Sequence, residues 1–359
     1  MLNKQRISIK QAKPGLIVSD DIYNSTNQLV ISKGVMLTDR IITRLKFNSI
    51  SEFNIIQETK EPLMPVKETS YSQKVRESIE FQEFQSAFTE QVDTFKNEFN
   101  KLTDKNEPID IDGLLEHTSD LLHKTRNGIH VFDMLHCMRQ YDDITYVHCM
   151  NVSLLCNVFG QWLKLPDKDL EVLTLAGLLH DVGKLSLPGE LINKQEKLTA
   201  SDYITIKTHP IQGYNILKNK GLDPRIANAA LMHHERCDGS GYPYKIKGDE
   251  IEPFAKIIGI VDVYDAMTSA RVYRPALSPF EAISVFESEG LQKYDPAYIL
   301  LFLEKIVQAY VGNRVRLSNG KEGEIRLINK QALSKPVIQL ASSFLDLSKE
   351  KDLKVEALL

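Results

Sequence analysis

Hydrophobic and polar residues are arranged in three different ways along the chain. In residues 1–60, short apolar runs such as Leu29–Ile31 are separated by turn-forming residues, which predicts a small domain that is β-rich or mixed α/β. In residues 115–310 the apolar positions recur with helical spacing, and glycine and proline are confined to short stretches between the helices. In residues 311–359, apolar and polar residues alternate on both sides of Asn319-Gly320, which predicts a hairpin in a small β appendage. We therefore expect a mainly α-helical protein with β-rich ends.

Residues 61–114 combine a linker with an amphipathic helix. Pro62 and Pro65 stand in a polar stretch that has the composition of a linker. The segment 71–102 then places a set of large apolar residues on one helical stripe: Phe84, Phe88, Phe95, Phe99 and Leu102. Such a stripe is typical of a helix that packs on its own domain. Its spacing is also compatible with a coiled coil, so a homodimer through the 71–102 helix remains an alternative.

Composition and charge exclude several classes of protein. The 44 lysines and arginines against 48 aspartates and glutamates give a net charge of −4, which is too small to indicate duplex nucleic acid or an anionic membrane as a partner. No apolar run approaches the roughly 20 residues that a membrane span requires, and the first residues do not form a signal peptide. Four cysteines in 359 residues do not make a disulfide framework, so we expect a cytoplasmic protein.

Histidines gather in the helical region and point to a site. Five of the nine lie within 87 residues, counted from the first to the last of them: His148, His180, His209, His233 and His234. Asp181 and Asp262 are nearby carboxylates that complete the donor set. Five imidazoles and two carboxylates exceed the needs of one tetrahedral zinc ion and suit two octahedral cations that share a carboxylate. Mixed nitrogen and oxygen donors favour iron or manganese.

Local spacing adds three expectations about these side chains. On a helix, Lys184 would project beside His180 and Asp181, because residues three and four apart share a face. Asp262 and Asp265, three residues apart, would share a face for the same reason. The adjacent imidazoles at positions 233 and 234 would diverge by about 100° if their segment is helical.

Two longer motifs carry a resemblance to a known family. Residues 180–184 read His-Asp-Val-Gly-Lys, and residues 233–243 read His-His-Glu-Arg-Cys-Asp-Gly-Ser-Gly-Tyr-Pro. They resemble the HD-x-GK and HHE-R-x-DG-x-GYP signatures of the HD-GYP phosphodiesterases, a bacterial subgroup of the HD superfamily that hydrolyses cyclic dinucleotides, above all cyclic di-GMP. The resemblance covers about residues 115–310 and implies that this region is a helical HD-GYP bundle.

The resemblance also implies a ligand set for two metal ions. One ion would be surrounded by four residues: His148, His180, Asp181 and Asp262. The other would be surrounded by Asp181, which bridges the two ions, and by three histidines: His209, His233 and His234. Some members of the family carry a glutamate four residues before the first histidine, where it supports a third metal. Here that residue is Ile144, which cannot ligate, so we expect two divalent ions per chain.

Four further positions match residues that act on the substrate in the family. Lys184 would contact the scissile phosphate, and Asp265 would orient or exchange a proton with the bridging water or the leaving oxygen. Arg271 and Arg274 would hold the nucleotide through paired contacts to guanine or phosphate. Tyr242, in the GYP loop, would lie beside the ligand, and the same loop is a candidate contact for a signalling partner.

The implied function is the metal-dependent hydrolysis of cyclic di-GMP to pGpG, with onward cleavage to GMP left open, through activation of a bridging hydroxide by the two metals. Residues 1–60 would then form a regulatory domain. One alternative is an HD phosphohydrolase that acts on another nucleotide, such as cyclic GMP-AMP. Another is a regulator that binds a cyclic dinucleotide without cleaving it. Degenerate relatives usually lose ligands, whereas this chain keeps all seven, which favours the enzyme.

Overall fold

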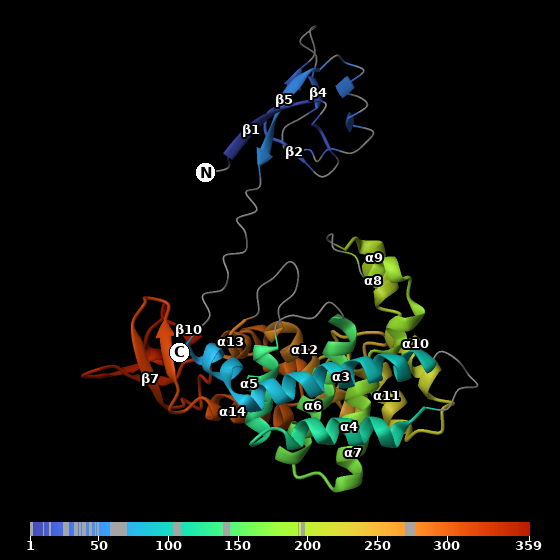
Figure 1. Ribbon diagram of the computed structural model, residues 1–359, viewed down its shortest axis with the longest axis vertical. Helices are drawn as coiled ribbons and strands as arrows, with labels where there is room; N and C mark the ends of the chain where they lie inside the picture. Colours follow the sequence, from blue (N-terminus) through green and yellow to red (C-terminus); the bar gives the residue numbers. More distant parts are fainter. Residues whose placement is uncertain are drawn as a thin grey trace. The chain divides into compact units, whose positions relative to one another are not determined.

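Two compact units, Met1–Lys67 and Glu68–Leu359, make up the chain. The structure is a computed structural model (Figure 1). It describes residues 3–9, 11–13, 16–23, 29–31, 35, 37, 41–42, 45–46, 48, 50–57, 70–102, 109–138, 144–192, 194, 198–269 and 277–359. The polar stretch predicted as a linker falls on residues outside these ranges for most of its length.

The first unit is built from short antiparallel strands. These are β1 (Asn3–Ser8), β2 (Ile17–Val18), β3 (Ile22–Tyr23), β4 (Leu29–Ile31) and β5 (Glu52–Gln57). β5 lies between β1 and β2, and β3 pairs with β4. Val18 and Leu45 are fully buried in a small core of their own, together with apolar residues from the strands. The prediction of a β-rich first domain is confirmed for the part of the chain that the structure describes.

Helices make up most of the second unit. They are α2 (Ser70–Glu77), α3 (Ile79–Lys101), α4 (Ile111–His123), α5 (Gly128–Cys137), α6 (Ile144–Trp162), α7 (Asp167–Leu179), α8 (Gly189–Ile192), α9 (Ala200–Ile206), α10 (His209–Leu217), α11 (Pro224–Met232), α12 (Pro253–Thr268), α13 (Pro279–Glu289) and α14 (Pro296–Ala309), with 3₁₀ turns η1 (Val182–Ser186), η2 (Gly248–Glu250) and η3 (Leu291–Lys293). α6 packs on α7, α12 and α3, and α11 packs on α7, α10 and α12 (Figure 1). The predicted mainly α architecture is therefore confirmed.

The aromatic stripe of α3 is buried within the second unit. Phe84, Phe88, Phe95 and Phe99 are at most 1% exposed, and they belong to the large hydrophobic core. The rings of Phe95 and Phe99 also meet Tyr146 of α6 edge to face, at centroid distances of 6.2 and 5.5 Å. The stripe is thus covered by the same chain. A homodimer through this helix would have to use its other faces, and it remains a prediction.

Prolines fix the starts of the helices that carry the candidate site. Pro210, Pro224 and Pro253 occupy the first turns of α10, α11 and α12. Proline suits this position because its ring presets the helical φ angle and because the first turn has no use for its missing N–H donor. The side chain of Glu252 also caps α12 by accepting a hydrogen bond from the backbone N–H of Ala255 at 2.9 Å. The sequence thus fixes where these helices begin.

A five-stranded antiparallel sheet closes the chain. Its strands are β6 (Arg314–Leu317), β7 (Glu322–Leu327), β8 (Val337–Gln339), β9 (Phe344–Asp346) and β10 (Val355–Leu358), in the order β10-β6-β7-β8-β9, with a 3₁₀ turn η4 (Leu347–Lys349). Gly320 adopts a φ of 80° in the β6–β7 hairpin, so the predicted turn is confirmed. Val315 and Ile338 are fully buried and belong to the same core as the helices. Among the described residues, no helix is both long and apolar enough for a membrane span.

Candidate metal centre

The seven predicted ligands come together from five helices and the turns that follow two of them. His148 lies on α6 and Asp262 on α12, His180 and His233 cap the C-terminal ends of α7 and α11, His209 begins α10, and Asp181 and His234 directly follow the two caps. Their donor atoms form two groups, in each of which all atoms lie within 4.8 Å of one another: Asp181 with His209, His233 and His234, and His148 with His180 and Asp262. The resemblance implies the same division of the histidines, with Asp181 shared by both groups.

Asp181 stands between the two groups, and its two oxygens face different ones. Oδ1 lies 3.2 Å from Nε2 of His209 and 3.8 Å from Nε2 of His233. Oδ2 lies 3.4 Å from Nε2 of His180 and 3.8 Å from Nε2 of His148. A single carboxylate is thus placed so that it can share its oxygens between two cations.

Hydrogen bonds behind the rings set the tautomer of three of the histidines. Nδ1 of His180, of His209 and of His233 each lies at hydrogen-bond distance from a backbone carbonyl three residues earlier. The acceptors are the carbonyl oxygens of Gly177, Ile206 and Ala230, at 2.8, 2.7 and 2.9 Å. A carbonyl only accepts, so Nδ1 carries the proton and Nε2 keeps its lone pair. His148 differs, because Nδ1 lies 2.7 Å from Oδ2 of Asp265 and Nε2 lies 3.0 Å from Oδ1 of Asp262, and the two carboxylates outweigh burial and raise its pKa to about 9.

Several lone pairs therefore face one another in a buried space. Nε2 of His209 lies 3.3 Å from Nε2 of His233, and both are acceptors in this tautomer. Nε2 of His180 and Oδ1 of Asp181 are buried and have no hydrogen-bond partner among the described residues. Leaving such an atom unsatisfied costs about 1–3 kcal/mol. A cation between these atoms would satisfy all of them, so the donor set fits a metal centre.

Burial and neighbouring charges adjust the protonation of the same groups. Burial, with the neighbouring imidazoles, lowers the pKa of His233 and of His234 well below the ordinary value, so both rings are neutral at pH 7. Burial by itself would raise the pKa of Asp181, but Lys184 and His180 outweigh it and hold this pKa well below the ordinary range. Neutral imidazoles beside an ionised carboxylate are the protonation states that metal ligands require.

Lys184 and Gly183 belong to the turn that carries Asp181. The ammonium of Lys184 donates to Oδ2 of Asp181 at 2.5 Å. A Cβ atom at Gly183 would lie 1.9 Å from the carbonyl oxygen of His209, which explains why only glycine fits there. Because of this close approach, η1 packs against α10, and Asp181 reaches the start of that helix.

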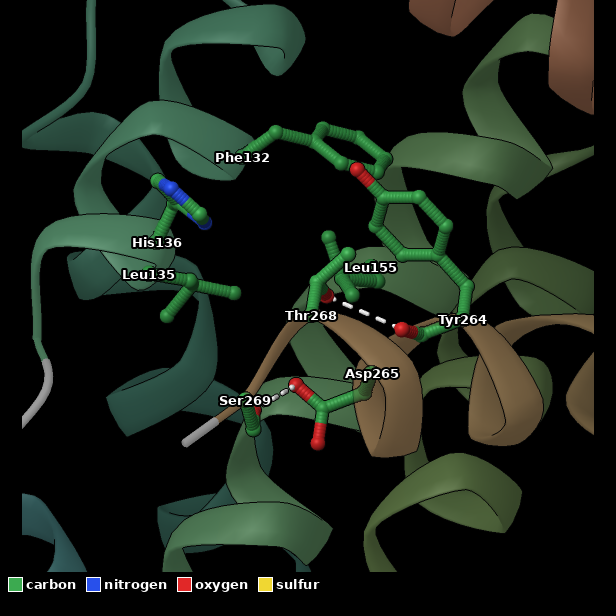
Figure 2. A pocket seen from close by; sticks show the side chains of 8 residues that line it. All are labelled: Phe132, Leu135, His136, Leu155, Tyr264, Asp265, Thr268 and Ser269. Atoms are coloured by element: carbon green, nitrogen blue, oxygen red, sulfur yellow. Dashed lines mark hydrogen bonds between the residues drawn. The ribbon is translucent and has the colours of Figure 1, made fainter. Parts of the chain in front are cut away.

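Asp265 lies behind His148. Its Oδ2 accepts a hydrogen bond from Nδ1 of His148 at 2.7 Å, while Oδ1 accepts from Nδ2 of Asn151 at 2.9 Å and from Oγ of Ser269 at 3.1 Å. Figure 2 shows Asp265 in the wall of a pocket that is also lined by residues of α5 and α6, with the hydrogen bond from Ser269 drawn. Both oxygens of Asp265 are therefore taken by donors of the protein.

Tyr242 lies against one of the ligand candidates, His234. Its ring stacks on that of His234 with a centroid distance of 4.5 Å and an interplanar angle of 26°. Glu235 holds the following residues, because its Oε1 accepts from the backbone N–H groups of Tyr244 at 2.6 Å and Lys245 at 3.1 Å. A buried carboxylate thus anchors the loop that carries Tyr242.

Two local expectations need correction. α7 ends at Leu179, so Lys184 reaches Asp181 from a 3₁₀ turn and not from a continuous helix. α11 ends at Met232, so the two following imidazoles do not diverge as they would on a helix, and their ring centroids lie 4.1 Å apart. The predicted face shared by Asp262 and Asp265 is confirmed, since both lie on α12. Arg271 and Arg274 lie outside the described residues.

Comparison with known proteins places this region in a family. A family model described as the HD domain matches residues 118–298, which is half of the chain. The chain belongs to the HD domain family. The metal-ligand candidates of this HD domain all lie within the matched range.

Two curated relatives and one solved structure illustrate the likeness. A cyclic di-GMP phosphodiesterase of Pseudomonas aeruginosa is 32% identical over 229 residues, which are 62% of this chain and 55% of the relative. A 3′3′-cGAMP-specific phosphodiesterase of Vibrio cholerae is 37% identical over 145 residues, 40% of this chain and 34% of the relative. The chain thus spans about half or less of these relatives. An HDG"Y"P protein from Bdellovibrio bacteriovorus is 17% identical with a TM-score of 0.48, covering 85% of this chain and 99% of that one.

Sequence reasoning missed the residues that support the HD domain's ligands. Asn151 and Ser269 were not predicted to hold Asp265, although both lie one turn of helix from a predicted site residue. Glu235 is part of the motif, but the motif does not reveal that its carboxylate binds the backbone of the loop. Lys207, whose ammonium lies over the ring of Tyr242, gave no signal at all.

Proposed function

We propose that this chain is a metal-dependent phosphodiesterase that hydrolyses cyclic di-GMP to the linear dinucleotide pGpG, with onward cleavage to GMP as a second step. The observation that carries the proposal is the position of Asp181, whose two oxygens face two separate groups of buried donors. The names of the curated relatives supply the substrate class.

Seven side chains would hold two divalent cations. His148, His180 and Asp262 form one set, His209, His233 and His234 form the other, and Asp181 belongs to both. The mixture of imidazole and carboxylate donors favours iron or manganese. Bound cations of this kind supply Lewis acidity and lower the pKa of water, which is the chemistry that a phosphodiester requires.

The protein's own groups would orient the reactants. Lys184, one quarter exposed at its side chain, can reach a phosphate oxygen while it remains close to Asp181. Its positive charge would then stabilise the negative charge that grows on the phosphoryl oxygens. Formation of pGpG breaks the bond between phosphorus and a 3′ oxygen, the oxygen of water takes its place on phosphorus, and the 3′ oxygen leaves with a proton.

Asp265 would act through His148. Because donors from the protein occupy both of its oxygens, we assign it a positioning role in place of direct proton exchange with the leaving oxygen. A carboxylate behind a ligating imidazole fixes the tautomer and raises the basicity of the ligand.

A second candidate substrate is cyclic GMP-AMP. It is favoured by the relative from Vibrio cholerae, whose 37% identity exceeds that of the cyclic di-GMP phosphodiesterase over a shorter range. The two substrates differ in one base, so residues that contact bases would decide between them. Arg271 and Arg274 stay candidates for such contacts.

A single assay tests the proposal and its alternatives. Protein loaded with manganese or iron is incubated separately with cyclic di-GMP and with cyclic GMP-AMP, and the products are resolved by chromatography. We expect pGpG to accumulate, and Asp181→Ala to abolish its formation. If neither dinucleotide is cleaved while Asp181→Ala binds cyclic di-GMP as tightly as the wild type, the protein is a binding regulator and the proposal is wrong.

A further inference from the structure

A layered contact connects the end of α9 to the candidate metal centre. The ammonium of Lys207 lies 5.1 Å from the ring centroid of Tyr242, and the ring of Tyr242 stacks on that of His234. Lys207 is the C-cap residue of α9 and precedes the ligand candidate His209 by two positions. The ring of Tyr242 therefore lies between the exposed Lys207 ammonium and His234, a residue of the centre.

Lys207 also differs from the other cations near the centre in its bonding. Lys184 is engaged by Asp181. Arg236 donates to the backbone carbonyls of His233 and Glu235. Within the described part of the chain, no carboxylate lies within ion-pair distance of the Lys207 ammonium. Among these residues, the contact made by its positive charge is with the face of the Tyr242 ring.

A cyclic dinucleotide carries negative charge that a cation in this position could bind. The molecule contains two phosphodiesters, each with one negative charge, and only one of them can occupy the centre at a time. The other remains anionic outside the histidine cluster. A lysine suits it, because an ammonium is a compact charge with three donors on a flexible stem and needs no fixed approach angle.

We infer that Lys207 binds the second, non-reacting phosphate of a cyclic dinucleotide and so favours substrates with two phosphodiesters over substrates with one. The inference rests on the proposed function, since it concerns the same site. Lys207 would contribute equally to the ground state and the transition state, because the phosphate that it binds does not react. Its loss should therefore raise KM and leave kcat nearly unchanged.

The test compares two substrates on the full-length, metal-loaded protein. Cyclic di-GMP carries two phosphodiesters, and bis(p-nitrophenyl) phosphate carries one. Lys207→Met keeps most of the side chain's length and removes its charge. We expect the KM for cyclic di-GMP to rise about 10-fold, the size of a lost charged hydrogen bond. The kcat/KM for bis(p-nitrophenyl) phosphate should change by less than about 2-fold, because no second phosphate is present. Lys207→Arg should restore most of the KM.

Lys218 provides a matched control. Its ammonium lies 5.5 Å from the ring centroid of Tyr214, and it caps the far end of α10. Lys218→Met therefore removes the same charge and the same type of contact away from the centre, and both substrates should be unaffected. The inference is overturned if Lys207→Met leaves the KM for cyclic di-GMP unchanged, or if it impairs both substrates equally, as a purely structural support of Tyr242 would.

The failure of the proposed function can be recognised separately. Wild-type protein that cleaves bis(p-nitrophenyl) phosphate but no cyclic dinucleotide would contradict the proposed substrate class. The role of Lys207 is then judged by the Kd of cyclic di-GMP, measured by calorimetry on the wild type and on Lys207→Met. A Kd about 10-fold higher for the variant supports the inference, and equal values overturn it.

Discussion

Replacing Asp265 by asparagine changes one donor–acceptor relation in the centre and leaves the shape of the side chain intact. Asp265 is 3% exposed and accepts from Nδ1 of His148 at 2.7 Å. In Asp265→Asn, the amide oxygen can still accept from Asn151 and Ser269, so the amide nitrogen turns toward His148. Nδ1 of His148 must then accept, and the proton moves to Nε2. Nε2, which lies 3.0 Å from Oδ1 of Asp262, then keeps its proton and offers no lone pair to a cation.

The expected size of this effect follows from the bond that is broken. A hydrogen bond to a charged group contributes about 1.5–3 kcal/mol, and loss of such a partner behind a ligating histidine typically costs about 10- to 100-fold in metal affinity or activity. The group formed by Asp181, His209, His233 and His234 does not contain His148. We therefore expect Asp265→Asn to weaken the binding of one cation by about 10- to 100-fold and that of the other by much less.

Manganese titration followed by calorimetry resolves the two binding events, and kcat is measured at each metal concentration. Ser269→Ala serves as the control, because it removes a donor at 3.1 Å from the same carboxylate without touching the bond to His148. Its effect on cation binding should be clearly smaller than that of Asp265→Asn, because the carboxylate keeps its bonds to His148 and Asn151. The reasoning is refuted if Asp265→Asn binds both cations as tightly as the wild type and keeps its kcat.

Two further predictions concern stability and one concerns metal binding. Phe95→Ala empties a fully buried site and should lower the free energy of unfolding in urea by about 3–5 kcal/mol. The molecular mass in solution should not change, and dissociation of a dimer would contradict the packing of Phe95 inside its own chain. Gly183→Ala would place Cβ 1.9 Å from the carbonyl oxygen of His209 and should abolish metal binding measured by calorimetry, whereas Gly189→Ala, with no atom within 4 Å, should bind normally. Burial raises the pKa of Glu252 to about 7 from 4.5, so its contribution to stability is complete below pH 4.5 and is lost as the pH rises through 7. Between pH 5 and 8 the wild type should lose about 2 kcal/mol of unfolding free energy relative to Glu252→Gln, and parallel curves for the two proteins would show that this carboxyl does not titrate.

Much of the fold could be predicted because it follows from local rules. Helical spacing and the confinement of proline to helix starts give the helical unit, and Asn319-Gly320 gives the hairpin of the last sheet. The end of α7 could not be predicted in this way. The apolar pattern continues through Val182, which is fully buried, whereas the close approach of Gly183 to α10, where the 3₁₀ turn lies, is a tertiary contact.

The donor set of the centre could also be predicted from the sequence, because histidine and aspartate are metal ligands by residue type. The residues that hold these ligands in place could not be predicted. Asp265 meets His148 only because α12 packs on α6, and 117 positions separate the two residues. The contact between Lys207 and Tyr242 likewise depends on how the loop folds back over His234. Such pairings depend on tertiary packing, which the spacing of residues along one element does not report.

The most direct test of a centre for two cations that acts as a phosphodiesterase is a metal titration followed by turnover. Metal-free protein is loaded with zero to four equivalents of manganese, and bound metal and pGpG formation are measured on the same samples. We expect binding to stop at two ions per chain and turnover to rise mainly with the second. Full turnover with a single ion, or two bound ions without any cleavage of a cyclic dinucleotide, would contradict it.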